Sequence, residues 1–509
     1  MHNYMYFVYS SYMYMHVSII YYLENFKSIR IFGTGHIYIQ KKGQKLFIID
    51  HRMPNYCFIK MLLDVFASLV LLLSSNVLMV ASSENQVPVE IATVVGNAFL
   101  ENELTFINWE GGFQYGPAIV VDGLYEALEI LDDETKSSWE NQLSAILSHY
   151  FEVNNENTIP CNQTCPYGKC LKFRSCAFDI LNTKMPLSDS IFRNVGDLMN
   201  LFPIGYLRRY DLNNKLYASD LELAKITVNK YILPFPLRTF DGTFSREGGF
   251  NNKDEEIYYD DSNNEDGKIA PFLWADDQFM GLTLMARLST TATPTITDEQ
   301  RLQMVSFISK MQLRFIKHIY DHDHDGLIYH GTFLNENMKK YSCCKWGRAN
   351  GWGAMSHMEV LKSLEQFPNH PDRSKILQSY QTFIDSMLKF QDEITGRWRQ
   401  VINETSTYLE TSVTAMMVTA MATGIKMKWL VSKENSIYNY TDVTLKAWHG
   451  LLTQIEKNGT VNNVCMGTGI QANFTQYNER GTDYWQSSPG GVGTVLRAAV
   501  AMKKMLEKS

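Results

Sequence analysis

The feature that most constrains the fold of this chain is a long series of helix-forming segments with very little strand alternation. Along residues 298–320, 373–390 and 409–426, apolar side chains recur at every third or fourth position, which is the period of a buried helix face. The same pattern predicts about twelve helices, near residues 87–102, 113–131, 138–152, 187–209, 215–232, 274–288, 298–320, 349–366, 373–390, 409–426, 440–456 and 489–507. The sequence therefore predicts an all-α protein.

The loops between alternate helices are long and rich in Gly, Asp, Asn and aromatic residues, as in residues 239–268 and 321–352. No Pro-rich or Ser-rich linker divides the series, so we expect residues 84–509 to form a single domain. Helix pairs with functional loops gathered at one end favour hairpins closed in a ring, an (α/α)6 barrel. An open helical solenoid is the alternative, but no repeat of fixed period supports it.

The N-terminal residues differ from the rest of the chain. Residues 1–60 are rich in Tyr and Met and lack turn signals, so we expect no folded structure there. From Met61 an apolar run ends in small residues, which is typical of a signal peptide over residues 61–83. The run over residues 62–81 is also long enough to span a membrane, so an uncleaved anchor is the alternative.

Cysteines and glycosylation sequons agree with a secreted or lysosomal protein. Four of the eight Cys lie within residues 161–176 without the CxxC pairs of zinc ribbons, which favours local disulfides over zinc. They are Cys161, Cys165, Cys170 and Cys176, whereas Cys343 and Cys344 are adjacent and Cys465 stands alone. Sequons occur at Asn162, Asn403, Asn439, Asn458 and Asn473. The net charge of −7, without a basic cluster, gives no indication of a nucleic-acid partner.

The most informative motif is FLWADDQFMGLTLMAR, over residues 272–287. It places Asp276 and Asp277 beside Trp274 at the start of an apolar helix, where a carboxylate is costly unless it is paired or functional. Beside an aromatic ring that can stack on a sugar, such an acid suits acid/base catalysis. Capping of the helix N-terminus is the alternative for either Asp. With the later motifs, this pattern indicates a carbohydrate-active enzyme.

The ordered set WADDQFM, YHG, WGRANGW, RWRQV, YLETS and GGVGTVL resembles the unsaturated rhamnogalacturonyl hydrolases of glycoside hydrolase family 105. These six-hairpin enzymes are close to the family 88 unsaturated glucuronyl hydrolases, and the resemblance runs over residues 109–496. It implies an oligosaccharide substrate that ends in a 4,5-unsaturated uronic acid, and neither a metal nor an organic cofactor. It also implies that one Asp protonates C4 and then activates water for attack at C5. Ordinary glycosidases instead use two carboxylates that flank the glycosidic bond.

The resemblance assigns catalytic roles to two acids. Asp276 matches the acid/base, with Asp277 as its competitor, because the sequence does not show which side chain turns inward. Asp197, next to Gly196, resembles a second acid that contacts the sugar near the reacting carbons, and an N-cap is its alternative.

Substrate-binding roles are implied for His330, Trp274 and the WGRANGW segment. Arg348 can hold the uronic carboxylate through its planar fork of donors. Trp346 and Trp352 can stack on sugar rings, with packing at a helix start as the alternative. Glu410, Trp398 and Gln400 are expected to line or support the same rim, although Glu410 is equally suited to the first turn of the following helix.

Two departures from the family pattern bear on substrate preference more than on the fold. The family has a His-Lys pair after Gly-Gly-Phe, but here only Lys253 matches. Thr332 follows the His-Gly pair, where many members have Trp.

Residues 321–326, DHDHDG, begin like a calcium loop but lack the Glu at the twelfth position, so we interpret them as a polar turn.

We therefore predict a secreted (α/α)6 hydrolase that acts on unsaturated uronyl oligosaccharides, with rhamnose as the leaving sugar. The alternatives are a glucuronyl substrate from ulvan or glycosaminoglycan fragments, and a non-catalytic sugar-binding protein on the same scaffold. The oligosaccharide is the only expected partner, and a membrane is involved only if residues 62–81 remain uncleaved.

Overall fold

The structure is a computed structural model. It describes residues 26–32, 36–41, 44–48, 86–101, 115–151, 224–225, 228–235, 237–246, 251–252, 255–256, 272–291, 295–334, 339–432, 437–482 and 489–507. Its contacts divide the chain into two units, Met1–Ser82 and Ser83–Ser509, which are described separately.

The first unit contains a three-stranded antiparallel sheet in the order β1-β2-β3. Its strands are β1 (Phe26–Phe32), β2 (His36–Lys41) and β3 (Gln44–Ile48). We expected no folded structure in this segment. The overlooked signal is the alternation of Ile37 and Ile39 with polar or amphipathic residues, together with short connections that contain Gly.

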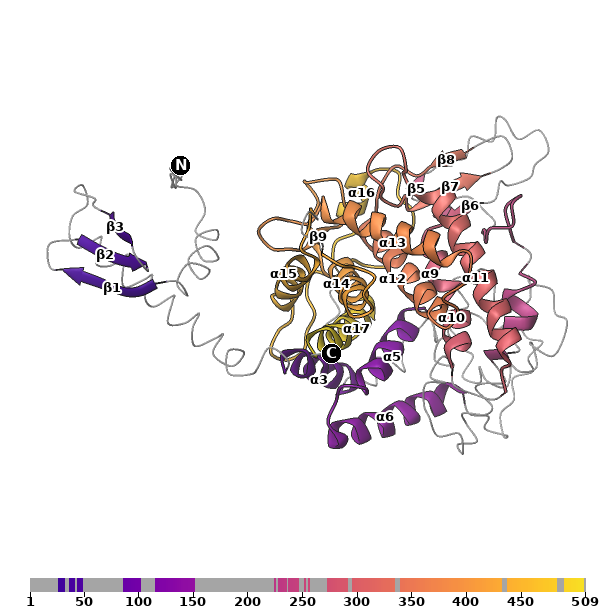
Figure 1. The fold of residues 1–509 in the computed structure, drawn as a ribbon, viewed down its shortest axis with the longest axis horizontal. Helices are drawn as coiled ribbons and strands as arrows, with labels where there is room; N and C mark the ends of the chain where they lie inside the picture. The colour runs from indigo at the N-terminus through magenta and orange to yellow at the C-terminus, as the bar shows by residue number, and fades with distance from the viewer. Residues whose placement is uncertain are drawn as a thin grey trace. The chain divides into compact units, whose positions relative to one another are not determined.

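Helices dominate the second unit (Figure 1). They are α3 (Val87–Glu101), α5 (Tyr115–Ala127), α6 (Asp133–Phe151), α9 (Asp277–Met280), α10 (Thr283–Thr290), α11 (Asp298–Ile319), α12 (Gly347–Leu364), α13 (Arg373–Leu388), α14 (Thr411–Lys426), α15 (Tyr440–Leu452), α16 (Phe474–Glu479), α17 (Pro489–Leu506) and the π-helical turn η3 (Val228–Ile232). The expected helices that correspond to α3, α11, α12, α13 and α14 are confirmed, with ends within two residues of the prediction. The helix expected near residues 187–209 lies outside the described residues.

The described helices form an inner and an outer layer that alternate along the sequence. Among the inner helices, α17 packs on α5 and α14, α14 on α12, and α12 on α10. The outer helices α3, α15, α13 and α11 each pack on an inner one. Nearly every residue of α12 and α14 is buried, as expected for helices surrounded by others, whereas α13 buries mainly one face.

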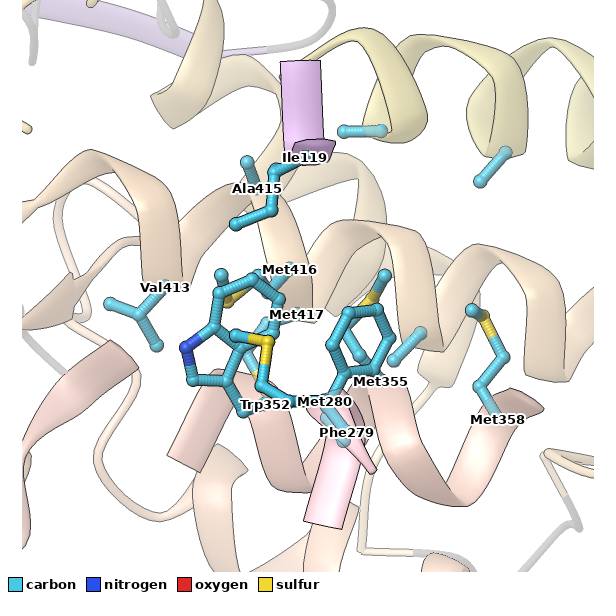
Figure 2. Packing of buried hydrophobic residues seen from close by; sticks show 14 of the residues in the cluster. Ile119, Phe279, Met280, Trp352, Met355, Met358, Val413, Ala415, Met416 and Met417 are labelled. Atoms are coloured by element: carbon cyan, nitrogen blue, oxygen red, sulfur yellow. The ribbon is translucent and has the colours of Figure 1, made fainter. Parts of the chain in front are cut away.

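The inner helices meet through methionines, aromatic rings and glycines. Trp352 of α12 stacks on Phe279 of α9 with ring centroids 4.7 Å apart, among Met416 and Met417 of α14 (Figure 2). The GGVGTVL motif lies in α17, where a Cβ on Gly493 would lie only 2.4 Å from the carbonyl oxygen of Ile119 in α5. Glycine is therefore needed for the close approach of α5 and α17.

Short strands precede several inner helices. The sheet β6-β7-β8 consists of β6 (Phe272–Trp274), β7 (Gly331–Leu334) and β8 (Lys339–Tyr341). The pairs β9 (Trp398–Arg399) with β10 (Leu409–Glu410), and β4 (Asn251–Asn252) with β5 (Glu255–Glu256), are also antiparallel.

The helix predicted over residues 274–288 is wrong at its start. Trp274 lies opposite Gly331 in the β6–β7 pair, which keeps its backbone extended. The helical part begins at Asp277 and is divided into α9 and α10 at residues 281–282. The strand pairing matters for function because it brings Trp274 to the loop that carries His330.

No helix among the described residues combines the length and the apolar character that crossing a membrane requires. Residues 62–81, to which the signal or anchor prediction applies, lie outside the described part of the chain.

A buried cluster of charged residues connects four inner helices. Arg287 of α10 donates hydrogen bonds to Asp122 of α5 and, over 3.2 Å, to Glu359 of α12. Arg497 of α17 donates to the same two carboxylates, and its Nε lies 3.4 Å from Glu126. Burial favours the neutral guanidinium, but the neighbouring carboxylates outweigh it and raise the pKa of Arg287 well above its usual value. Arg287 therefore carries its positive charge at neutral pH.

We expect Asp122→Ala to lower the free energy of unfolding by about 3–5 kcal/mol, because it leaves two buried guanidinium groups short of a partner. The measurement is the urea midpoint with its slope. The matched control is Glu129→Ala, which removes a half-exposed partner of Lys504 and should change stability by about 0–1 kcal/mol. Equal losses in the two variants would contradict a structural role of the cluster.

Candidate active site

The candidate site forms where β6 ends and where the inner helices α9 and α12 begin. Trp274 at the end of β6 donates a hydrogen bond from its Nε1 to Nε2 of His330 over 3.0 Å. The same Nε2 atom lies 3.4 Å from Oδ2 of Asp276. The ring of Trp346, the residue just before α12, lies 4.4 Å from the His330 ring between centroids. The structure thus brings four of the sequence-predicted site residues together.

Asp276 is the acid that faces this group. Its side chain is 15% exposed, and its buried Oδ2 atom has no hydrogen-bond partner among the described residues. It occupies the position before α9, but its side chain makes no capping hydrogen bond. The capping alternative therefore does not account for Asp276.

Asp277 points elsewhere and is held by an arginine. Arg246 donates to its two oxygens, from Nε over 2.8 Å and from Nη2 over 2.5 Å, which is the paired geometry of a strong ion pair. Burial raises the pKa of Asp277, and Arg246 only partly opposes this effect. The Arg246 guanidinium also lies 4.2 Å above the Trp274 ring. The local geometry therefore separates the two adjacent acids into a paired Asp277 and an Asp276 that faces His330.

His330 is fully buried and held on both ring nitrogens. Besides the contact with Trp274, its Nδ1 lies 2.6 Å from the hydroxyl of Tyr477 in α16. Burial lowers the pKa of His330, and the nearby Asp276 carboxylate opposes this effect without reversing it. His330 is therefore neutral at physiological pH.

The two Trp side chains of the WGRANGW segment are more deeply buried than expected for side chains that stack on a sugar ring. Trp346 is 2% and Trp352 is 1% exposed. Trp352 lies in the core against Phe279, which agrees with the packing alternative. Trp346 borders the site, and its buried Nε1 has no hydrogen-bond partner among the described residues.

Arg348 is also buried and is engaged within the protein. Its Nε donates to Oγ of Ser412 over 2.9 Å, and its Nη2 donates to the carbonyl oxygen of Cys465. Its Nη2 lies 3.9 Å from Oε1 of Glu410, and a Cβ on Gly490 would lie 3.2 Å from its Cζ. These contacts fix the orientation of its guanidinium group.

Glu410 caps α14. Its carboxylate accepts hydrogen bonds from the backbone N–H groups of Ser412 and Val413 and from that of Cys465. Glu410 is thus the N-cap of α14 rather than a residue of its first turn, and it also anchors Ser412, which contacts Arg348.

Gln400 and Trp398 support the site from behind. The Nε2 of Gln400 lies 2.7 Å from Sγ of Cys465 and 3.3 Å from the carbonyl oxygen of Tyr477. Trp398 is fully buried and donates to the carbonyl oxygen of Met387 in α13. Both residues support the rim rather than line it.

The DHDHDG loop is held by a lysine. Lys345, the neighbour of Trp346, lies 2.8 Å from Asp321 and 3.2 Å from Asp325 through its Nζ atom, and 3.4 Å above the Tyr329 ring. The lysine supplies the positive charge that balances these carboxylates. It also ties the loop before His330 to the segment that carries Trp346.

Cys343 and Cys344 form a disulfide between adjacent residues. The carbonyl oxygen of Cys344 accepts a hydrogen bond from the backbone N–H of His330 over 3.3 Å. Cys465 is buried and is the free cysteine of the described part of the chain. Asp197, Lys253 and the four cysteines of residues 161–176 lie outside the described residues, so their predicted roles remain predictions.

Sequence reasoning did not single out Arg246, Tyr477 or Ser412. Ser412 is part of the YLETS motif, so its position could have been found there. Tyr477 is 147 residues away from His330 in the sequence, and no local pattern connects the two. Arg246 is separated from Asp277 by 31 residues.

Comparison with known proteins identifies the family. A model of Glycosyl Hydrolase Family 88 matches residues 206–506, which is more than half of the 509-residue chain. The chain belongs to Glycosyl Hydrolase Family 88. Among curated relatives of this family 88 chain, the unsaturated rhamnogalacturonyl hydrolase YesR of Bacillus subtilis (strain 168) is 27% identical over 152 residues. That match covers 30% of this chain and 40% of YesR, so the chain spans less than half the length of this relative.

Solved structures confirm the fold of this family 88 chain. A glycoside hydrolase from family 105 of C. acetobutylicum ATCC 824 has a TM-score of 0.56 and 18% identity, covering 81% of this chain and 98% of its own. The unsaturated glucuronyl hydrolase of Bacillus sp. GL1 has a TM-score of 0.51 and 12% identity, covering 81% and 95%. The predicted (α/α)6 barrel is thereby confirmed.

We expect Lys345→Met to weaken the pH dependence of stability in acid. Burial would raise the pKa of Asp321, but hydrogen bonds from Lys345, His324 and Tyr329 outweigh it and hold the pKa well below its usual range. A lowered pKa in the folded state stabilises the protein above the unfolded value of about 3.9, and this contribution is lost as pH falls below it.

The measurement is the urea midpoint as a function of pH between about 2.5 and 7. Lys345→Met should be less stable than the wild type at pH 7 and should lose less stability below about pH 4. Lys375→Met is the control, because Lys375 is 65% exposed and lies 3.5 Å from Asp372. Parallel curves for wild type and Lys345→Met would contradict the proposed effect.

Proposed function

We propose that this family 88 protein removes a 4,5-unsaturated uronic acid from the non-reducing end of oligosaccharides by hydration of the C4–C5 double bond. The observation that carries the proposal is Asp276, a carboxylate with one buried oxygen that has no hydrogen-bond partner among the described residues and lies beside neutral His330. Its neighbour Asp277 is occupied by Arg246.

The proposed reaction needs one acid with two successive tasks. Asp276 in its acid form donates its proton to C4 of the vinyl ether, which places positive charge at C5. The resulting carboxylate then takes a proton from a water molecule as the water oxygen bonds to C5. The hemiketal collapses, the ring opens and the next sugar leaves. One carboxylate suffices because protonation occurs at carbon rather than at the glycosidic oxygen, unlike the two-carboxylate mechanism.

For substrate binding we propose that Trp274, which is partly exposed, offers the stacking surface, and that His330 and Trp346 form the wall beside Asp276. Arg348 remains the proposed partner of the uronic carboxylate, oriented by Ser412 and Glu410. Asp197 and Lys253 keep their proposed substrate contacts. Trp352 supports α12 from the core in this proposal.

The proposed substrate class is a rhamnogalacturonan-type fragment, supported by the similarity to YesR, whose name describes an unsaturated rhamnogalacturonyl hydrolase. A glucuronyl oligosaccharide is the second candidate. It is favoured by the missing His before Lys253, a departure from the rhamnogalacturonyl pattern, and by the family 88 match.

We also propose that the protein is a secreted glycoprotein. All four sequon asparagines within the described residues have exposed side chains, namely Asn403, Asn439, Asn458 and Asn473. Exposure is required for glycan attachment, so these positions are compatible with passage through the secretory pathway.

We expect Asp276→Asn to lower kcat by at least about 100-fold, because an amide cannot donate the required proton. The assay is the loss of ultraviolet absorbance of the conjugated enol-carboxylate, with unsaturated galacturonyl-rhamnose and, separately, with an unsaturated glucuronyl disaccharide. Loss with one substrate alone would choose between the two candidates. Glu129→Ala is the control, since Glu129 lies outside the site.

An Asp276→Asn variant with wild-type kcat would refute the assigned acid. Wild-type protein that is folded, binds the unsaturated sugar and leaves its absorbance unchanged would instead support the non-catalytic sugar-binding alternative.

A further inference from the structure

The two ring nitrogens of His330 have partners that together allow only one protonation state. The indole N–H of Trp274 is a donor only, and it points at Nε2 of His330 over 3.0 Å. The Nε2 atom must therefore accept, so it carries no proton. In a neutral imidazole the proton then lies on Nδ1, which is 2.6 Å from the Tyr477 hydroxyl oxygen.

The Tyr477 hydroxyl is built into the site as an acceptor. Its oxygen also accepts a hydrogen bond from the backbone N–H of Gln471 over 3.2 Å. Tyr477 is fully buried, and its ring lies 6.4 Å from that of Trp346 in a stacked orientation. Gln400 holds the Tyr477 backbone through its carbonyl oxygen. These contacts leave the hydroxyl oxygen little freedom to move away from His330.

We propose that Tyr477 is a positioning residue that, together with Trp274, holds His330 as the neutral tautomer with its proton on Nδ1. A proton on Nε2 would face the indole N–H of Trp274, so the imidazolium is disfavoured by geometry. The charged groups around the ring are Asp276, which favours the imidazolium, and Arg246 and Arg348, which oppose it.

The consequence for the reaction rests on the proposed function. Asp276 Oδ2 lies 3.4 Å from Nε2, but the lone pair of Nε2 already accepts the indole N–H of Trp274, so Nε2 does not take a proton from Asp276. The proton remains on the carboxyl group, where donation to C4 of the substrate requires it. His330 thus stays neutral beside the acid, and Tyr477 maintains this state through its contact with Nδ1.

The direct test is nitrogen-15 NMR of the full-length protein labelled at its histidines, with His330→Gln identifying the His330 signals. We expect Nδ1 to be protonated and Nε2 to be unprotonated, without titration between about pH 5.5 and 8. A proton on Nε2, or a charged ring at neutral pH, would overturn the proposal. This measurement does not depend on any catalytic activity.

The variant test is Tyr477→Phe. Removing the acceptor of the Nδ1–H bond should release the ring, so that its tautomers mix, and should lower kcat about 10-fold with KM changed less than about 3-fold. Tyr380→Phe is the matched control. Tyr380 is equally buried and donates from α13 to the carbonyl oxygen of Ala420 in α14, without contact to His330, so its loss should leave both the tautomer and kcat unchanged.

The outcomes separate the two hypotheses. A wild-type protein with the expected tautomer but no activity on either unsaturated sugar would refute the proposed function and leave the role of Tyr477 intact. A Tyr477→Phe protein with the wild-type tautomer and the wild-type kcat would refute the role of Tyr477. If Tyr477→Phe does not fold, Trp274→Phe tests the same arrangement by removing the hydrogen-bond donor to Nε2 of His330. The His330 ring is then expected to titrate.

Discussion

The rest of the structure depends on one buried ionic cluster. Its members are Arg287, Arg497, Asp122, Glu126 and Glu359. It joins α5, α10, α12 and α17, four inner helices that lie far apart along the sequence. Charges in a dry interior are tolerated only when they are paired, so each helix must keep the depth and rotation that maintain the pairing. Methionines and aromatic rings fill the remaining space among the inner helices (Figure 2).

This fixed interior determines where the ends of the inner helices lie. Helices α9, α12 and α14 begin near the same loops, and each start carries a residue of the site or of its support. Glu410 caps α14 and contacts Ser412, Ser412 contacts Arg348, and Arg348 belongs to α12. Lys345 ties the loop before His330 to the same helix start through Asp321. The site therefore owes its geometry to buried polar contacts between segments far apart in the sequence.

Within the site, environment alone distinguishes two neighbouring acids. Asp277 is fully buried and satisfied by the two donors of Arg246. Asp276 retains a buried oxygen without a hydrogen-bond partner among the described residues, beside a histidine that burial keeps neutral. A carboxyl group that changes protonation during a reaction must not be held permanently by a cation. The separation of the two environments is thus what acid/base chemistry at one residue requires.

The sequence by itself determined the all-α class, the approximate ends of most described helices, and the motifs that mark the site. These follow from local rules, namely the helical period of apolar residues and the ordered motifs around Asp276, His330 and Arg348. The tertiary structure decided what local rules do not encode. It showed that Trp274 lies in a strand, that Trp352 is core, and that Asp276 rather than Asp277 faces His330. It also brought in Arg246 and Tyr477, because a contact across 31 or 147 residues depends on how the helices pack and leaves no periodic trace in the chain.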